Sequence, residues 1–314
     1  MADTAACPDV FAPLAEIGAE VVTLAADQQV LLERIGEFDA YFASLQVRAD
    51  AQVMSRAPRL RVIATASTGT DHIDLAAAQQ RNIAVLSLKD DTAFLNQLTA
   101  TAELAWALLL ATVRRLPAAV AAAKQGIWGR DQFRGHQLSG KTLGVLGYGR
   151  LGRMVAEYGK AFRMRVLACN DTEVCPAPQV QMVSFDTLLR DSDVLSIHIH
   201  LTDRNRKLIN RNAIQRMKPG SVLINTSRGA IIDEAALLEA LQTGHLAGAG
   251  LDVIDGEWEP DLIRHPLLRY AREHENLVIT PHIGGVTYES QRMAFAHTVQ
   301  KLRDFLLNNR EASR

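Results

Sequence analysis

The sequence has little cysteine and lacks the clusters of metal-binding side chains that would point to a structural metal. Its three cysteines, Cys7, Cys169 and Cys175, are too few and too scattered for a disulfide framework. Cys169 and Cys175 have no nearby histidine or third thiol, which a zinc site requires. Reduced thiols are typical of cytoplasmic proteins. We therefore expect no metal site and a cytoplasmic location.

The sequence also has almost no net charge and no long apolar run. Its 34 basic and 35 acidic residues leave a net charge of −1, so electrostatics give no reason to expect nucleic acid or a membrane surface as a partner. The most apolar stretch, residues 104–113, is too short to cross a bilayer and predicts a buried helix. The N-terminal residues do not have the pattern of a secretory signal.

Short β-branched runs alternate with helical patterns along the chain, which predicts an α/β protein with parallel sheets covered by helices. The 314 residues, 48% of them hydrophobic, suffice for two domains. Strands are expected at 21–24, 40–43, 60–64, 83–86, 142–146, 165–168, 194–197, 221–224, 250–253 and 277–280. Helices are expected at 74–81, 92–115, 118–124 and 234–242.

A last helix is predicted after Gly285, long enough to return to the first part of the chain. Its apolar residues fall near one face: Met293, Ala296, Val299, Leu302 and Phe305. The first domain would then be discontinuous, made of residues 1–100 and 287–314. Residues 101–286 would form the second domain.

The glycine string Gly147-Tyr148-Gly149-Arg150-Leu151-Gly152 follows a predicted strand and opens a predicted helix. In that context it predicts a dinucleotide site. Gly147 permits the tight turn, Gly149 lets the backbone approach a pyrophosphate, and Gly152 lets helix and strand pack closely. The helix N-terminus attracts the phosphates. We expect Arg150 and Leu151 to lie beside the cofactor as well.

A dinucleotide site also requires an acidic residue about 20 positions after the glycine string, where the carboxylate binds the ribose hydroxyls. Asn170 and Asp171 occupy that place. Asp171 favours NAD, whereas Asn170 alone would discriminate poorly. Because Arg163 and Arg165 are close in sequence, NADP stays possible.

Polar residues follow three later strands, and strand ends of this kind bind ligands. Thr226 and Arg228 follow residues 221–224, and the Arg228 guanidinium can grip a carboxylate with two hydrogen bonds. Glu257 follows Asp252 in the loop after the next strand, and His282 follows the strand after that. A carboxylate that orients an imidazole suits proton transfer near neutral pH. Two alternatives stay open. Glu259 competes with Glu257 for the role, and His282 would otherwise be an ordinary core or surface histidine, a residue type that is not rare in this part of the chain, as His198, His200, His265 and His274 show.

In the first part of the chain, Ser67, Thr68 and Gly69 follow the strand at residues 60–64. Backbone N–H groups of this loop could form an anion-binding nest. We expect the loop to bind the substrate opposite Arg228. A simple strand-to-helix turn is the alternative.

Five segments together resemble the D-isomer-specific 2-hydroxyacid dehydrogenase family. They occur in order along nearly the whole chain: Thr68–Asp74, Gly144–Gly152, Asn225–Gly229, Gly248–Val253 and Pro281–Gly285. The resemblance implies two Rossmann-like or flavodoxin-like domains, with an NAD-binding domain inserted in the substrate domain and the active site in the cleft between them. It also implies a homodimer that interconverts a small D-2-hydroxy acid and a 2-keto acid.

The resemblance also implies roles for single residues. Arg228 would bind the substrate carboxylate, and His282, paired with Glu257, would be the acid/base. Asp252 would hold the nicotinamide amide, and Thr226 and Gly284 would lie by the cofactor. Glu257 is preferred to Glu259 because it follows Asp252 at the family's usual interval.

The sequence departs from the family pattern in places. Asn170 stands where an acidic residue is usual, and the loop before Pro260 is longer than usual. Three alternatives therefore stay open. They are an NADP-dependent glyoxylate or hydroxypyruvate reductase, a formate dehydrogenase, although that branch typically has Gln in place of Glu257, and a non-catalytic, corepressor-like dinucleotide sensor on the same fold.

Overall fold

The computed structural model describes residues 7–172 and 174–311, and the chain divides into two compact units. One unit consists of Met1–Leu98 and Thr287–Arg314, and the other of Thr99–Val286. Each described sheet is parallel throughout, with three strands in the first unit and seven in the second. The α/β class predicted from the sequence is confirmed.

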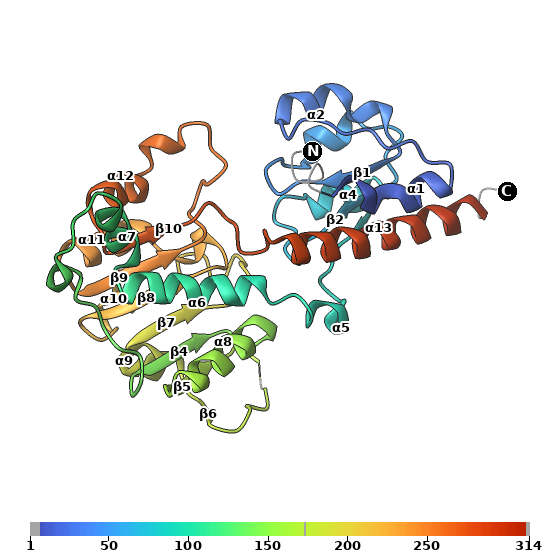
Figure 1. Cartoon of the computed structure of the whole chain (residues 1–314). Helices are drawn as coiled ribbons and strands as arrows, with labels where there is room; N and C mark the ends of the chain where they lie inside the picture. Colours follow the sequence, from blue (N-terminus) through green and yellow to red (C-terminus); the bar gives the residue numbers. More distant parts are fainter. Residues whose placement is uncertain (1–6, 173, 312–314) are drawn as a thin grey trace. The chain divides into compact units, whose positions relative to one another are not determined.

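The first unit is a sheet with helices on both faces (Figure 1). Its strands lie in the order β1 (Ala40–Ala43), β2 (Val62–Thr65), β3 (Ala84–Leu86). One face packs against α2 (Gln28–Arg34), α3 (Ala51–Ser55) and α4 (Leu75–Gln80), and the other against α1 (Ala12–Glu16) and α13 (Tyr288–Glu311). Along β2, Ile63 joins one core cluster, whereas Val62 and Ala64 join the other. This alternation is expected of a strand buried on both faces.

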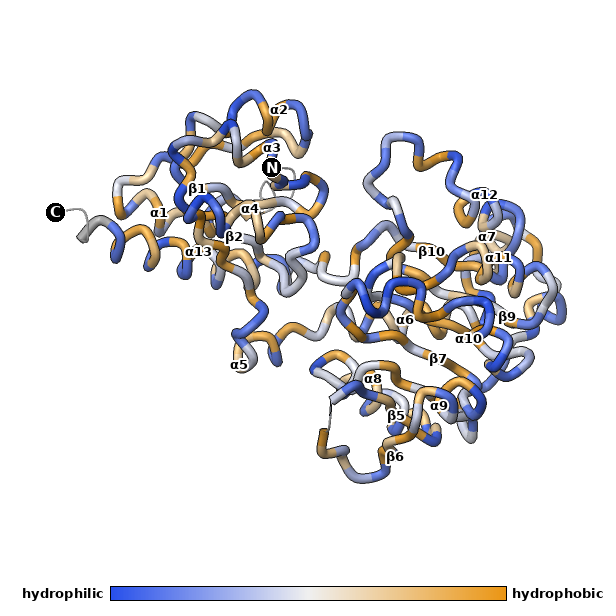
Figure 2. Tube along the Cα trace, turned by 180° about the vertical axis from the view of Figure 1, so that it is seen from behind, coloured by the Kyte–Doolittle hydropathy of each residue, from blue (hydrophilic) through white to orange (hydrophobic). Residues whose placement is uncertain are grey.

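The second unit is a doubly wound sheet. Its strands lie in the order β10 (Leu277–Ile279), β9 (Leu246–Leu251), β8 (Ser221–Asn225), β7 (Val194–Ile197), β4 (Thr142–Leu146), β5 (Arg165–Cys169), β6 (Val180–Met182). The order of strands reverses between β4 and β7, where such sheets bind ligands beyond the carboxyl ends. Figure 2 shows β7, in the middle of the sheet, as an apolar segment.

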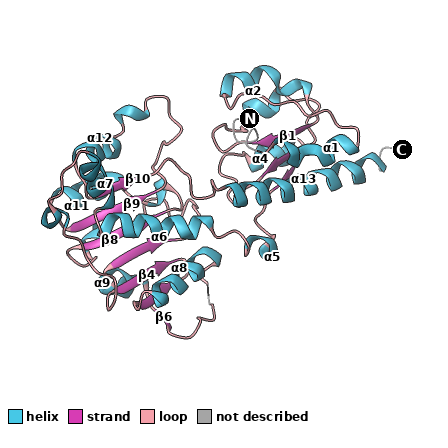
Figure 3. Ribbon diagram, in the orientation of Figure 1, coloured by secondary structure: helices cyan, strands magenta, loops and turns pink. Residues whose placement is uncertain are grey.

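Two layers of helices cover this sheet (Figure 3). One layer is α6 (Ala100–Val113) and α8 (Arg150–Ala161). The other is α9 (Phe185–Asp191), α10 (Arg211–Gln215), α11 (Glu234–Gln242) and α12 (Pro266–Glu273). The remaining helices of the described residues are α5 (Thr92–Leu95) and α7 (Leu116–Lys124). Short 3-10 turns lie at Pro8–Phe11, Ile35–Glu37, Arg130–Phe133, Gly229–Ile231 and Leu262–Arg264.

Among the described residues, the stretch Thr92–Val113 is long and apolar enough to cross a membrane by length and composition. Its larger part, α6, buries Trp106, Leu109 and Val113 in a core cluster shared with β4. The apolar character of α6 is therefore accounted for by its packing on the sheet.

Several predicted elements were wrong in detail. Residues 21–24 form no strand, and Val21 and Val22 are exposed. The helix predicted at 92–115 is broken between α5 and α6. Strand β6, with an exposed Gln181 at its centre, was not predicted. Along α13, Ala296 is exposed, and the buried face instead runs through Phe295, Val299 and Leu302.

His198 marks the point where the strand order reverses. Its backbone N–H donates to Leu146 O at 2.7 Å, and its ring Nε2 lies 2.8 Å from Ser196 Oγ. Ring atom Nδ1 is buried, with no hydrogen-bond partner among the described residues. Burial lowers the pKa of His198 to about 4. The imidazole is therefore neutral in the folded protein at physiological pH.

This burial predicts a loss of stability in mild acid. The unfolded imidazole takes up a proton below pH ~6.5, while the folded one resists it down to about pH 4. The buried, neutral His198 therefore makes the free energy of unfolding larger above pH ~6.5 than near pH 4, by on the order of 3 kcal/mol, and this difference is lost as the pH falls toward 4. His198→Gln should flatten this part of the pH dependence of the urea-unfolding free energy, whereas the exposed-site variant His136→Gln should not. Equal slopes for wild type and His198→Gln would contradict the assignment.

Candidate active site

The candidate residues of the second unit gather at one edge of its sheet. Gly147 follows β4, Arg228 follows β8, Asp252 follows β9 and His282 follows β10. Since all these strands are parallel, their carboxyl ends meet at the same edge. The sheet therefore brings the polar residues and the glycine string Gly147–Gly152, called the glycine turn from here on, to one side of the unit.

The glycine turn has the shape that close ligand approach requires. Gly147 has φ +94°, and a Cβ on it would lie 2.6 Å from His198 O. A Cβ on Gly152 would lie 2.0 Å from Gly147 O, so helix α8 could not pack this closely with any larger residue. A Cβ on Gly149, by contrast, would meet no atom within 4 Å. The open space beside Gly149 is where a pyrophosphate would approach the helix N-terminus.

Asn170 supports this turn from the end of β5. Its Oδ1 accepts the Tyr148 N–H at 2.9 Å, and its Nδ2 donates to Thr172 Oγ1 at 2.8 Å. Asp171, the next residue, is exposed. Burial, and then the Asp171 charge, raise the pKa of the adjacent Cys169 thiol. The amide of Asn170 is thus used within the protein, and Asp171 is the carboxylate at this strand end.

The residues present fit a bound dinucleotide. Thr226 Oγ1 and His198 Nδ1 are buried at this edge, and neither has a hydrogen-bond partner among the described residues. Arg150 opens helix α8, and its burial lowers the pKa of its guanidinium. Leu151 packs against the core below. A ligand that hydrogen-bonds to the two unpartnered atoms would remove the cost of leaving them buried and unsatisfied.

His282 and Glu257 form a close pair. His282 Nδ1 lies 2.7 Å from Glu257 Oε1, and only 17% of each side chain is exposed. The Trp258 ring stacks near the imidazole, with ring centres 5.9 Å apart. Glu259 is exposed and takes no part in the pair. The carboxylate orients the ring, so Nε2 is the atom that can exchange a proton with a ligand.

Asp252 organises the loop that carries His282. Its side chain is buried and accepts from Thr280 Oγ1 at 2.6 Å, from the Ile283 N–H at 2.9 Å and from the Gly284 N–H at 2.7 Å. Burial raises the pKa of Asp252, although these donors and the charge of His282 oppose the rise. His282 itself has a left-handed backbone, with φ +54°. The three hydrogen bonds hold the loop in a conformation that costs a non-glycine residue energy.

The loop with Arg228 is held by a buried amide. Asn225 is fully buried, its Oδ1 accepts the Ser227 N–H and its Nδ2 donates to Arg228 O, both at 2.9 Å. The Arg228 guanidinium donates to Ser227 O at 2.8 Å. Sequence reasoning missed the roles of Asn225 and Thr280. An Asn or Thr at the end of an apolar strand is the signal that could have found them.

The remaining candidates have local partners of their own. Ser67, in the first unit, donates to Gly69 O at 2.6 Å and lies 3.0 Å from Thr65 Oγ1, while the neighbouring Thr68 is partly exposed. Among the other histidines, His265 pairs with Glu234 and His274 stacks on Tyr270. Within residues 7–172 and 174–311, no cluster of His, Cys, Asp and Glu could hold a metal ion.

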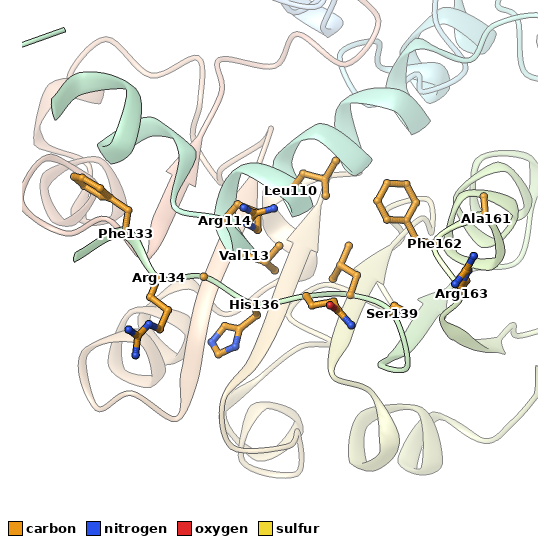
Figure 4. A pocket seen from close by; sticks show the side chains of 13 residues that line it. Leu110, Val113, Arg114, Phe133, Arg134, His136, Ser139, Ala161, Phe162 and Arg163 are labelled. Atoms are coloured by element: carbon orange, nitrogen blue, oxygen red, sulfur yellow. The ribbon is translucent and has the colours of Figure 1, made fainter. Parts of the chain in front are cut away.

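A cavity of about 890 Å³ lies at the opposite, amino-terminal edge of the sheet. Figure 4 shows Arg114, Phe162 and Arg163 among the residues that line it. None of the candidate catalytic, substrate-binding or cofactor-binding residues lines it, because they follow the carboxyl ends of strands, whereas Arg163 precedes β5.

Known proteins resemble this chain over most of its length. A hydroxypyruvate reductase from Thermotoga maritima is 36% identical over 283 residues, which cover 90% of each chain. A D-3-phosphoglycerate dehydrogenase from Archaeoglobus fulgidus is 39% identical over 87% of this chain. The match covers about half of that longer protein, 51%.

A solved structure is similar to this chain as well. The D-lactate dehydrogenase from Aquifex aeolicus, complexed with NAD and lactic acid, matches with a TM-score of 0.79 and 29% identity, over 97% of this chain and 93% of that one. Residues 106–284 match the family model described as D-isomer specific 2-hydroxyacid dehydrogenase, NAD binding domain. The chain therefore belongs to the D-isomer specific 2-hydroxyacid dehydrogenase family and is an NAD(P)-dependent oxidoreductase of 2-hydroxy and 2-keto acids.

Proposed function

We propose that the chain reversibly converts a small D-2-hydroxy acid into the 2-keto acid with NAD as cofactor. The observation that carries this proposal is the His282–Glu257 pair, at the same sheet edge as Arg228 and the glycine turn. The bound nicotinamide supplies or accepts the hydride at the C2 carbon of the acid. The protein's own residues bind the acid and move the proton.

His282 Nε2 gives a proton to the C2 oxygen in reduction and takes it back in oxidation. Because Nδ1 faces Glu257, the ring cannot turn without losing that contact. The carboxylate also stabilises the imidazolium form, which must be present before reduction. Trp258 covers the ring on one side and limits the access of water to it.

Arg228 binds the substrate carboxylate. Its planar guanidinium can form two parallel hydrogen bonds with a carboxylate, which fixes the C2 atom as well as the charge. The same cation stabilises the negative charge that develops on the C2 oxygen during hydride transfer. Roles for Ser67, Thr68 and Gly69 in substrate binding, and for Asp252 and Gly284 beside the nicotinamide, stay predictions.

NAD is favoured over NADP by the positions of the charged groups near β5. The Asp171 carboxylate lies at the strand end where the ribose is expected, and it would repel a 2′-phosphate. Arg165 opens β5 and donates to Gln181, and Arg163 precedes it, so both lie at the other end of the strand. An NADP-dependent glyoxylate or hydroxypyruvate reductase is the alternative within the family.

A homodimer is part of the same proposal. Helix α7 buries none of its residues, and it exposes Leu116 and Val120. Ile127 and Trp128, just beyond it, are also exposed, Trp128 by 85%. A second copy that packs on this apolar segment would cover it. A monomer in sedimentation at micromolar concentration would contradict this.

A cytoplasmic location, which the unpaired cysteines favour, stays a prediction.

A panel of 2-keto acids, each assayed with NADH and with NADPH by nicotinamide absorbance, tests the proposal. We expect turnover of at least one small keto acid, faster with NADH, and a product of the D configuration. Cofactor binding without turnover across the panel would instead support a dinucleotide sensor.

Removing the acid/base should stop most turnover. His282→Ala should lower kcat by roughly two orders of magnitude or more, the usual contribution of a positioned proton donor. The affinity for NADH, measured by fluorescence titration, should stay nearly unchanged. His274→Ala, at an exposed histidine of the same unit, is the control. Near-normal turnover in His282→Ala would exclude His282.

Removing the carboxylate-binding cation should weaken the use of the keto acid. Arg228→Ala should lower kcat/KM by about 10- to 100-fold, because hydrogen bonds to charged groups contribute about 1.5–3 kcal/mol. Arg228→Lys keeps the charge but loses the planar pair of donors, so an intermediate loss is expected. Unchanged kinetics in Arg228→Ala would remove Arg228 from the mechanism.

The pH dependence should identify the carboxylate partner of His282. In Glu257→Gln the imidazolium loses its negative neighbour, so the limb of the pH–kcat/KM profile for reduction that falls with rising pH should move to lower pH. Glu259→Gln is the matched control, two residues away and exposed, and it should not shift the profile. The reverse pattern would assign the role to Glu259.

A further inference from the structure

A second acid–imidazole pair lies at the base of the loop that carries Glu257. Glu234, the first residue of α11, accepts the Asp255 N–H through Oε1 at 2.7 Å. His265 Nε2, at the far end of the loop, lies 3.1 Å from Asp255 O and 3.2 Å from Glu234 Oε2. Both backbone polar groups of Asp255 are therefore held by this pair.

The pair is largely enclosed, with 13% of the His265 side chain and 18% of the Glu234 side chain exposed. Burial raises the pKa of Glu234, although the Asp255 N–H and the His265 ring oppose the rise. His265 Nδ1 is buried and has no hydrogen-bond partner among the described residues. Since enclosing these groups costs free energy, stability alone is a weak reason for their arrangement.

Asp255 connects two parts of the candidate site. It precedes Gly256, which has φ +78° and begins the turn closed by the Glu259 N–H to Gly256 O bond at 2.9 Å. That turn presents Glu257. A Cβ on Gly229, next to Arg228, would lie 2.2 Å from Asp255 N, so the two loops are in direct backbone contact. A shift of Asp255 would move Glu257 and press on the Arg228 loop.

We propose that Glu234 and His265 are positioning residues that clamp Asp255 and thereby hold Glu257 against His282. This inference rests on the proposed function, because Glu257 is taken as the partner of the acid/base. Neither side chain touches the reacting atoms, so their effect on catalysis passes through the loop.

The clamp is tested first without catalysis. Backbone hydrogen exchange of the folded full chain should show faster exchange at the Asp255 amide and along residues 255–261 in Glu234→Ala and in His265→Ala. Glu234→Gln keeps an acceptor for the Asp255 N–H and should restore much of the protection. Glu239→Ala is the matched control, because Glu239 lies on the same helix and pairs with Arg211.

The second measurement is kinetic. Glu234→Ala and His265→Ala should lower kcat for keto-acid reduction by about 10- to 100-fold, the scale of a small misplacement of catalytic groups. They should also shift the pH profile to lower pH, as Glu257→Gln does. In the Glu257→Gln background neither substitution should shift the profile further, since the residue through which they act is already absent.

The outcomes separate the two proposals. Unchanged exchange in both single variants, or a pH shift that adds fully to that of Glu257→Gln, would overturn the clamp even if the chain reduces keto acids. Faster exchange at Asp255 in a chain that turns over no keto acid would support the clamp and refute the proposed function. If one single variant fails to fold, the other single variant and Glu234→Gln still decide.

Discussion

The buried carboxylate of Asp252 is the interaction on which the candidate site depends. It receives one hydroxyl and two backbone donors from the segment that contains His282, and it does so at the end of β9, beside β10. A buried carboxylate of this kind is unfavourable unless it is hydrogen-bonded. The energy that it gains from the three donors also keeps His282 in its left-handed conformation. The imidazole is thus held in one orientation by the protein itself, as the proton transfer proposed for it requires.

The rest of the site is arranged around this point by the parallel sheet. The loops that follow the strands all lie at the same edge. Each loop is held by a side chain that takes no part in the proposed reaction. Asn225 anchors the Arg228 loop and Asn170 anchors the glycine turn. The Glu234–His265 pair would do the same for the Glu257 loop. Side chains that take no part in the proposed chemistry thus hold the candidate residues in place.

Much of this arrangement could be predicted from the sequence. The buried strands at 142–146 and 194–197 were predicted with the bounds observed, because continuous apolar runs between loop residues are typical of parallel strands. The strand predicted at 21–24 was wrong, because an apolar run does not by itself show that the segment pairs with another strand. The break between α5 and α6 was missed because the local pattern stays helical across it.

The candidate residues of the second unit were predicted to follow strand ends, and they lie at one edge of the sheet because parallel strands place their ends together. The anchoring contacts were not found. Asp252 reaches Gly284 across 32 positions, and Glu234 reaches Asp255 across 21. Contacts between residues so far apart depend on the register of neighbouring strands and on rotamers, neither of which a local pattern contains. Asn170 shows the same limit, since no local pattern indicates that its amide oxygen accepts the Tyr148 N–H.

A crystal structure of the protein with NADH and oxamate, an unreactive analogue of a 2-keto acid, tests whether Arg228 and His282 meet at the substrate. We predict that the oxamate carboxylate lies on the Arg228 guanidinium and that its amide carbonyl oxygen, which stands in for the keto oxygen of a substrate, accepts a hydrogen bond from His282 Nε2. The contact between His282 Nδ1 and Glu257 should persist. Oxamate bound elsewhere, for example in the cavity lined by Arg114 and Arg163, with His282 turned away from it, would contradict the account.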